Sequence, residues 1–473
     1  MNLGGKIVAA DSLSLYGGKS VELGATTTET QSQLGRTETG NKLVDRQSEV
    51  TVTGKDGKIS IQSDGDITAK AAKVKSTGTV DVNAKGKLSV TTEKQSSKEH
   101  YDFSNNHHYH LDKESEVGSV IEGKDGVRLI GQEETTLRQA KVSSEDGKVM
   151  VASKGDVLIE EGRNIEHLDT RNKQKSKGFL TKETEERRHH HDYDLAEGSK
   201  LQGKNVEILS QTSNVSVKGS DIQAKENIHL QGNQVRVTAS LDKREVQDSY
   251  SFKKSGLDAS GKGGVMRIGY QRGKLNNNGS SYNESVNGSE LVAKNGNLSI
   301  YAQQDVDVDA SRLASGKDMS ITGKNVHLNA MNEQHDSEYH QEQKSTGFGM
   351  GFVYDPVSRA KENYRQKEAQ GATKSVVGKA MGASDAVADS IESMVRGIQP
   401  YANHNRSESN KYNQKTVAKI TSLEAGRNMS INAIEGDIRT QGSSISAEGD
   451  AQFIAAKNVD FNVAVHEQSQ HAS

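Results

Sequence analysis

The chain contains no cysteine, no tryptophan and only two prolines among its 473 residues. Without cysteine, a disulfide-stapled scaffold and a zinc site built on thiolates are both excluded. The absence also suits a chain exported through an oxidising periplasm, because no thiol can be trapped in a disulfide on the way. The scarcity of proline favours order, since disordered chains are usually rich in proline and a β-ladder cannot accept it.

Apolar and aromatic residues are also scarce. They make up 32% and 4% of the chain, whereas ordinary globular domains contain about 45–50% apolar residues. The length alone would suggest about three domains, but this composition cannot fill several compact cores. It indicates an elongated fold with a thin core.

The charge is nearly balanced, with 61 basic and 64 acidic residues. Nucleic-acid binding requires a clustered basic surface, so we expect no nucleic-acid partner. No apolar run approaches the roughly 18 residues that predict a membrane-spanning helix.

An internal repeat runs through most of the chain. Apolar residues alternate with polar ones in residues 57–92, 126–161, 203–239, 295–330 and 425–463, and residues 6–23 match the second half of the pattern. Such alternation is the two-residue period of a half-buried strand. Because the opening residues enter the pattern halfway, we expect the chain to be a segment of a longer protein. We place the repeat blocks at about 1–23, 53–92, 119–161, 199–239, 289–330 and 419–465.

The apolar pairs recur at an interval of about 21 residues. Ile59 and Val80 are one interval apart, as are Leu298 and Met319. An interval of this length, carrying about three short strands, is one coil of a β-solenoid whose coils stack at about 4.8 Å. About eleven coils would span about 50 Å. The residues expected in the core ladders are Ile59, Ile61, Ile67, Val80, Val82, Leu88, Val90, Leu298, Ile300, Val306, Val308, Met319, Ile321, Val326 and Leu328.

A set of antiparallel hairpins is the alternative architecture for these blocks. Hairpins favour Asp-Gly or Asn-Gly pairs between their strands, and such pairs occur at residues 56–57, 125–126 and 295–296. They do not separate every pair of strands, however, and hairpins would not require the 21-residue recurrence.

Polar excursions of varied length separate the blocks, at about 24–52, 93–118, 162–198, 240–288 and 331–418. Three of them rejoin the repeat through a similar Gly-Ser step, in residues 116–123, 196–203 and 286–293. In the last excursion, apolar residues at spacings of three, four and seven predict a short helical insertion over 356–398.

The blocks resemble a known family, above all in GDITAKAAKVKSTGTVDVNAKGKLSV (65–90) with its polar excursion and returning Gly-Ser strand. They are similar to the haemagglutinin repeats of two-partner secretion exoproteins, which include filamentous haemagglutinin and contact-dependent growth inhibition effectors. The resemblance implies an all-β fold, a right-handed parallel β-helix. It also implies export through an outer-membrane partner transporter and a location that is secreted or at the bacterial cell surface.

In growth-inhibition effectors, the resemblance implies that such a region helps to carry a C-terminal toxin, which has a cognate immunity protein, into a target cell. We therefore expect a non-enzymatic repeat stalk without a cofactor, whose excursions contact a target-cell envelope or receptor and transiently its membrane. An adhesin stalk that binds host surfaces is the first alternative. A β-helix enzyme acting on polysaccharides is a more remote one.

Two histidine-rich tracts lie in the excursions, HHYHLD at 107–112 and HHHDYD at 189–194. His110 and His190 each stand eight residues before the glycine of the Gly-Ser step, and Ser280 holds that position in the next excursion. We therefore expect outer residues on the return strands of projecting hairpins. One strand face supplies at most two imidazoles, so we predict no metal site. The alternatives are a pH-responsive surface or a joint site whose candidate ligands are His108, His110, His189 and His191.

An acidic triplet, Asp305, Asp307 and Asp309, alternates with Val306 and Val308. It could bind Ca²⁺ or form a carboxylate pair for glycoside cleavage. As a calcium loop it lacks glycine at the sixth position and glutamate at the twelfth, so we interpret it as the solvated outer face of a strand. GFGMGF at 347–352 is either a strand that meets lipid or a partner, or a flexible hairpin.

Overall fold

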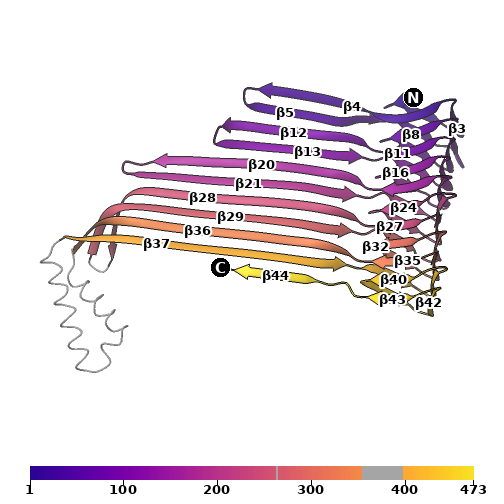
Figure 1. Cartoon of the computed structure of the whole chain (residues 1–473). Coiled ribbons are helices and arrows are strands. Elements are labelled where there is room, and N and C mark those ends of the chain that lie inside the picture. The colour runs from indigo at the N-terminus through magenta and orange to yellow at the C-terminus, as the bar shows by residue number, and fades with distance from the viewer. Residues whose placement is uncertain (263–264, 354–397, 473) are drawn as a thin grey trace.

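The computed structural model describes residues 1–262, 265–353 and 398–472. Every regular element in these ranges is a β-strand, and none of the described residues forms a helix that could cross a membrane. Short parallel strands wind into a β-helix, and long antiparallel strands project from one of its corners (Figure 1). The expected all-β parallel β-helix is confirmed.

Three strands make one coil, and each coil stacks its strands in parallel on those of the next. Two of the faces contain eleven strands each within the described residues. The first face consists of β2 (Lys6–Ala9), β6 (Glu49–Val52), β9 (Lys73–Ser76), β14 (Val120–Gly123), β17 (Lys141–Ser143), β22 (Lys200–Gly203), β25 (Asp221–Ala224), β30 (Glu290–Ala293), β33 (Arg312–Ser315), β38 (Thr421–Ala425) and β41 (Ser443–Ala447).

The other two faces complete each coil. The second face consists of β3 (Ser12–Gly17), β7 (Lys58–Ser63), β10 (Thr79–Ala84), β15 (Gly126–Gly131), β18 (Lys148–Ser153), β23 (Asn205–Ser210), β26 (Ile228–Gly232), β31 (Leu298–Ala302), β34 (Met319–Gly323), β39 (Met429–Ala433) and β42 (Ala451–Ala455). The third face consists of β1 (Asn2–Leu3), the start of β4 (Ser20–Leu34), β8 (Asp66–Lys70), β11 (Lys87–Thr91), β16 (Glu134–Arg138), β19 (Asp156–Glu160), β24 (Val215–Lys218), β27 (Val235–Thr238), β32 (Val306–Asp309), β35 (Val326–Asn329), β40 (Ile438–Gln441) and β43 (Val459–Asn462).

The core is a set of single-file apolar ladders inside the coils. Ile228 pairs in register with Leu298, which pairs with Met319 on the next coil. All the residues expected in the ladders are buried, and none is more than 3% exposed. Because every inward side chain contacts its equivalents one coil away, a chain with few apolar residues can still close a continuous core.

The corner between the third and first faces has two alternating forms. In every second coil it is a tight turn with one residue at positive φ, from 45° to 66°, and these residues are Gly4, Ala71, Gln139, Gly219, Ala310 and Gly442. In the coils between, a long hairpin leaves the same corner. The excursions therefore recur once per two coils because the two corner types alternate.

The Gly-Ser step is where a hairpin rejoins the β-helix. A Cβ added to Gly198 would lie 1.9 Å from the carbonyl oxygen of Gly219, so only glycine fits there. The buried Ser199 hydroxyl donates to the carbonyl of Glu160 at 2.8 Å and accepts from the backbone N–H of Ala140 at 3.0 Å. The step thus provides an acceptor for the buried N–H of Ala140, at the tight turn one coil away.

A buried ion pair ties a second hairpin to the coils. Glu116 lies near the foot of this hairpin with a side chain only 4% exposed. It accepts hydrogen bonds from Arg138 at 2.7 and 2.8 Å and from the backbone N–H of Arg163 at 3.3 Å. Burial alone would raise the pKa of Glu116, but the hydrogen bonds from Arg138 and Thr92 hold it below its usual value.

The excursions are hairpins that pair with one another. They are β4/β5 (Thr37–Gln47), β12 (Glu93–Ser104)/β13 (His107–Val117), β20 (Gly162–Lys177)/β21 (Thr181–Glu197), β28 (Ser240–Lys262)/β29 (Val265–Asn287) and β36 (Met331–Val353)/β37 (Ile398–Lys419), followed by β44 (Glu467–Ala472). Each return strand pairs antiparallel with the outgoing strand of the next hairpin, as β13 does with β20 and β21 with β28. The result is one continuous sheet, the hairpin sheet, which lengthens toward the later hairpins (Figure 1).

Among the residues that the structure describes, the hairpin sheet is a single layer with no other element packed on either face. In β13 nearly every side chain is partly exposed, whichever face it points to. One boundary differs from the expectation. The first hairpin ends at Gln47, and Glu49–Val52 is already the strand β6. The helical insertion expected over 356–398 lies outside the described residues except for Ile398, which begins β37.

Candidate functional site

Pairing between hairpins brings equivalent positions into rows that run across the sheet. His110 lies opposite Asp169, which lies opposite His190, and the row continues through Gln247 to Ser280. His110, His190 and Ser280 thus occupy equivalent positions, as their distance from the Gly-Ser step indicated. Because directly opposed residues of antiparallel strands point to the same side, each row belongs to one face of the sheet.

One face, here called the histidine face, carries His100, His108, His110, His167 and His190 with four aspartates. His108 Nε2 lies 3.2 Å from Asp169 Oδ2 on the next strand, and His110 Nε2 lies 3.0 Å from Asp102 Oδ1. The rings of His108 and His110 stack with centroids 4.7 Å apart. The side-chain exposures of 20% and 29% show that these imidazoles are partly covered by their neighbours.

A second cluster on the same face is centred on Asp192. Its carboxylate contacts His167 Nδ1 with one oxygen and His190 Nε2, at 3.1 Å, with the other. Burial alone would raise the pKa of Asp192, but the hydrogen bond from His167 and the charges of both rings lower it.

His189 and His191 lie on the opposite face, because side chains alternate along β21. His189 Nδ1 lies 2.7 Å from Asp248 Oδ1, and His191 Nε2 lies 3.1 Å from Glu166 Oε1. The structure therefore does not bring His108, His110, His189 and His191 together as one site. His108 and His110 share one face, and His189 and His191 share the other.

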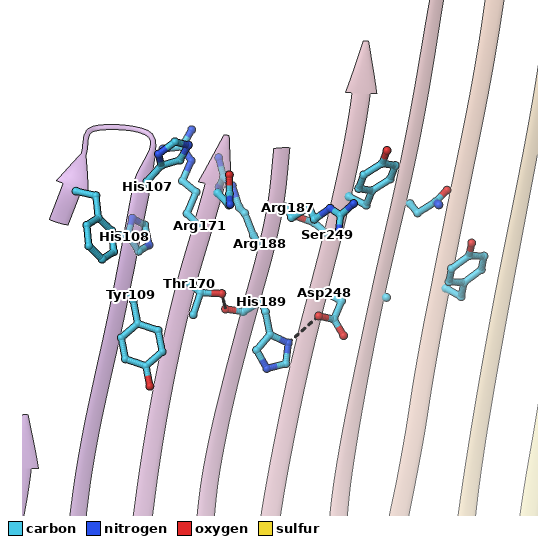
Figure 2. Close-up of a pocket in the computed structure, with 16 residues that line it drawn as sticks. His107, His108, Tyr109, Thr170, Arg171, Arg187, Arg188, His189, Asp248 and Ser249 are labelled. Carbon is cyan, nitrogen blue, oxygen red and sulfur yellow. Dashed lines mark hydrogen bonds and ion pairs between the residues drawn. The ribbon is translucent and has the colours of Figure 1, made fainter. Parts of the chain in front are cut away.

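A shallow groove lies on this opposite face (Figure 2). Tyr109, His189 and Tyr339 line it, and Gly279 leaves a gap in the row beside Tyr339. The Thr170 hydroxyl donates to the carbonyl oxygen of His189 at 3.4 Å and not to its imidazole. The His189–Asp248 pair therefore has no activated hydroxyl beside it, and the lining suits stacking and hydrogen bonding to a polar ligand.

The acidic triplet lies on the outer side of the β-helix. Each carboxylate bonds a residue of the next coil: Asp305 to Asn325 at 2.7 Å, Asp307 to His327 at 2.8 Å and Asp309 to Asn329 at 2.8 Å. The hydrogen bond from His327 lowers the pKa of Asp307, while burial raises the pKa of Asp309. One oxygen of each carboxylate is thus engaged in a bond between adjacent coils.

The far end of the hairpin sheet combines apolar and basic rows on the histidine face. Leu257, Tyr270 and Phe348 are directly opposed, and Ile268 faces Met350 in the next row. These side chains are 39–64% exposed. They include two residues of the GFGMGF stretch, which is a strand of the sheet, β36, through Val353.

A row of cations follows four residues closer to the β-helix. Lys253, Lys274, Lys344 and Arg406 are directly opposed on four successive strands. Like charges in such positions destabilise a sheet. Glu342 offsets part of this repulsion, with an oxygen 2.8 Å from Lys274 Nζ and another in contact with Lys344.

Comparison with known proteins confirms the repeat identified in the sequence. The family model of the hemagglutinin repeat matches residues 180–343, 268–387 and 402–473, more than half of the chain. No solved structure matches the chain.

Curated relatives carry the name CdiA. Toxin CdiA of Yersinia pestis is 28% identical over 297 residues, which cover 59% of this chain and 9% of that protein. The tRNA nuclease CdiA of Escherichia coli (strain STEC_O31) is 25% identical over 67% of this chain and 11% of its own length. The 16S rRNA endonuclease CdiA of Enterobacter cloacae is 25% identical over 72% of this chain and 11% of its own length.

The matched region spans about a tenth of the length of these relatives, so their nuclease activities are properties of those whole proteins. What this chain shares with them is the repeat. Proteins of this family are secreted or cell-surface exoproteins. The chain belongs to the hemagglutinin-repeat family, as a repeat region of a two-partner secretion exoprotein.

Proposed function

We propose that this chain is the delivery segment of a contact-dependent growth inhibition protein, and that it helps to carry a C-terminal toxin across the outer membrane of a target cell. In this role the β-helix is an exported stalk at the bacterial surface, reached through an outer-membrane transporter. The hairpin sheet is the part that contacts the target envelope. The parent system would also include the toxin domain and its immunity protein.

The observation that supports this role best is the far end of the hairpin sheet. Stable attachment to an anionic membrane generally needs an apolar element together with a basic patch. Phe348 and Met350 are 64% and 52% exposed, and the row of Lys253, Lys274, Lys344 and Arg406 runs parallel to them on the same face. The repulsion within that row is relieved when phosphate groups of an anionic lipid surface lie against it.

The test is a competition assay with the parent exoprotein carrying Phe348→Ser and Met350→Ser. The matched control is Leu34→Ser, which removes an apolar side chain that is 81% exposed at the tip of the first hairpin. We expect the double variant to be secreted normally and to bind target cells, but to lose most of its growth inhibition. Leu34→Ser should inhibit like the unaltered protein.

Unchanged inhibition by the double variant, with reduced binding to host cells, would contradict a delivery role and favour the adhesin. A second assay tests the apolar rows and the basic row separately, by sedimenting the purified chain with anionic and with zwitterionic lipid vesicles. Equal binding to both would mean that the basic row does not contribute to membrane contact.

A further inference from the structure

Two triads of histidine and aspartate on the histidine face are arranged as metal ligands. The first consists of His108, His110 and Asp169, and the second of His167, His190 and Asp192. Within each triad, one nitrogen or oxygen atom of every residue lies within 4.8 Å of the others. No single strand supplies either triad, so both depend on the pairing of strands within the hairpin sheet.

The first triad joins two separate hairpins. His108 and His110 are two residues apart on β13, so both rings project from the same face. Asp169 lies on β20, directly opposite His110, and its carboxylate reaches His108. The backbone hydrogen bonds between β13 and β20 therefore fix the positions of all three side chains.

The second triad lies within one hairpin. His190 and Asp192 are two residues apart on β21, and His167 on β20 is directly opposite Asp192. Both imidazoles already converge on one carboxylate. A cation between these side chains would therefore meet all three groups at once.

The spacing suits a small divalent transition-metal ion. Zn²⁺ binds imidazole nitrogen and carboxylate oxygen at about 2.0–2.1 Å, which puts tetrahedral ligand atoms about 3.3 Å apart. The His108–Asp169 distance of 3.2 Å and the His190–Asp192 distance of 3.1 Å are already close to that value. Two imidazoles and one carboxylate leave at least one position for water, and imidazole favours Zn²⁺, Cu²⁺ and Ni²⁺ over Ca²⁺ or Mg²⁺.

Additional carboxylates surround the first triad. Asp102 Oδ1 lies 3.0 Å from His110 Nε2, and the neighbouring His100 has its own partner in Asp112 at 2.9 Å. A carboxylate bonded to a ligating ring orients it and raises its basicity. The negative charge of these groups also favours a cation on this face.

We propose that the two triads bind divalent transition-metal ions, and that the ion at the first triad clamps one hairpin to the next. No apolar side chain of β13 or β20 is buried, so a bond between these two strands adds stability where packing supplies little. Binding to the folded chain alone raises its stability by mass action. The proposal does not depend on the delivery role, since it concerns how the sheet is held together.

The test titrates the full chain, purified without a histidine tag, with ZnCl2 by isothermal titration calorimetry. Co²⁺ absorption serves as a second readout of nitrogen and oxygen coordination. We expect two ions per chain with micromolar dissociation constants. His108→Asn with His110→Asn should abolish one of them, and His167→Asn with His190→Asn the other.

The matched control is His189→Asn with His191→Asn, which removes two histidines of the same strand from the opposite face. It should retain both ions. Asp169→Asn, which preserves side-chain shape, should weaken the first ion at least tenfold even if a double histidine variant folds poorly. The proposal is wrong if the unaltered chain binds Zn²⁺ only with dissociation constants more than 100 times the expected micromolar values. It is also wrong if the control loses as much binding as the triad variants.

Discussion

The β-helix and the hairpin sheet are both ordered with few apolar residues, but different interactions stabilise them. In the β-helix each inward apolar side chain is buried against its equivalents, and Ile208 is 0% exposed between Val151 and Leu230. In the hairpin sheet, Leu168 faces Leu111 across one strand pair and stays partly exposed. The first region is held by packing, and the second by main-chain ladders and cross-strand polar pairs.

The largest difference between the regions should appear when an apolar side chain is shortened. We expect Ile208→Ala to cost about 2–5 kcal/mol, because it leaves a cavity inside the ladder. Leu168→Ala should cost less than about 1 kcal/mol, since a cross-strand pair contributes little more than that. Urea unfolding followed by circular dichroism measures both. Equal costs would mean that the hairpin sheet has a buried side, contrary to the structure.

The junction between the regions depends on the buried carboxylate of Glu116. Glu116→Gln preserves its shape but removes the buried partner of Arg138, which keeps only Glu160 at 3.9 Å, at a cost of about 1–3 kcal/mol. Hydrogen exchange should show that amide protection decreases first in β12 and β13 and decreases less in the coils of the β-helix. Protection that falls uniformly along the chain would show that the two regions unfold as one unit.

Replacing two glycines by alanine should change the stability of the chain in opposite directions. Gly198→Ala forces a methyl group against the carbonyl of Gly219 at the corner, and we expect a loss of about 1–3 kcal/mol. Gly273→Ala, in β29, meets no atom within 4 Å and should stabilise the sheet by about 0.5 kcal/mol. Thermal denaturation of both variants checks the signs, and two losses of equal size would contradict the described corner.

Acid should weaken the hairpin sheet through Glu186, the smallest of these effects. Burial alone would raise the pKa of Glu186, but hydrogen bonds from Lys173, Arg188 and Arg171 lower it to about 2. A lowered pKa gives stability that is complete above the ordinary value of 4.5 and is lost as the pH falls toward 2. The difference in melting temperature between the unaltered chain and Glu186→Gln should therefore shrink over that range. A constant difference would argue against this ion-pair cluster.

The β-helix could be predicted from the sequence because its pattern lies within short stretches of the chain. The alternation around Ile59 and the 21-residue step to Val80 are visible without any knowledge of pairing, and the two residues are direct neighbours in the structure. The equivalence of His110, His190 and Ser280 followed from equal distances to the same Gly-Ser step.

Projecting hairpins were expected, but their pairing into one sheet was not predicted, because their strands carry no apolar period that would indicate a partner. Asp169 was missed for the same reason. It lies on an outgoing strand, and only the pairing of that strand with β13 brings it to His108 and His110. Asp169 and His190 are each the eighth residue from the ends of the hairpin Gly162–Glu197, so the position of the cluster follows once those two ends are known.

The central claim is that successive hairpins pair in one register, and a disulfide tests it most directly because the chain has no cysteine of its own. Ser281 on β29 lies opposite Ser337 on β36, and directly opposed residues lie about 4.5–5.5 Å apart between Cα atoms, within the reach of a disulfide. Ser281→Cys with Ser337→Cys should oxidise nearly completely under mild conditions, as measured by loss of maleimide labelling. Ser281→Cys with Ser345→Cys, eight residues along the same strand, should remain reduced. Equal oxidation of both pairs, or of neither, would contradict the continuous hairpin sheet.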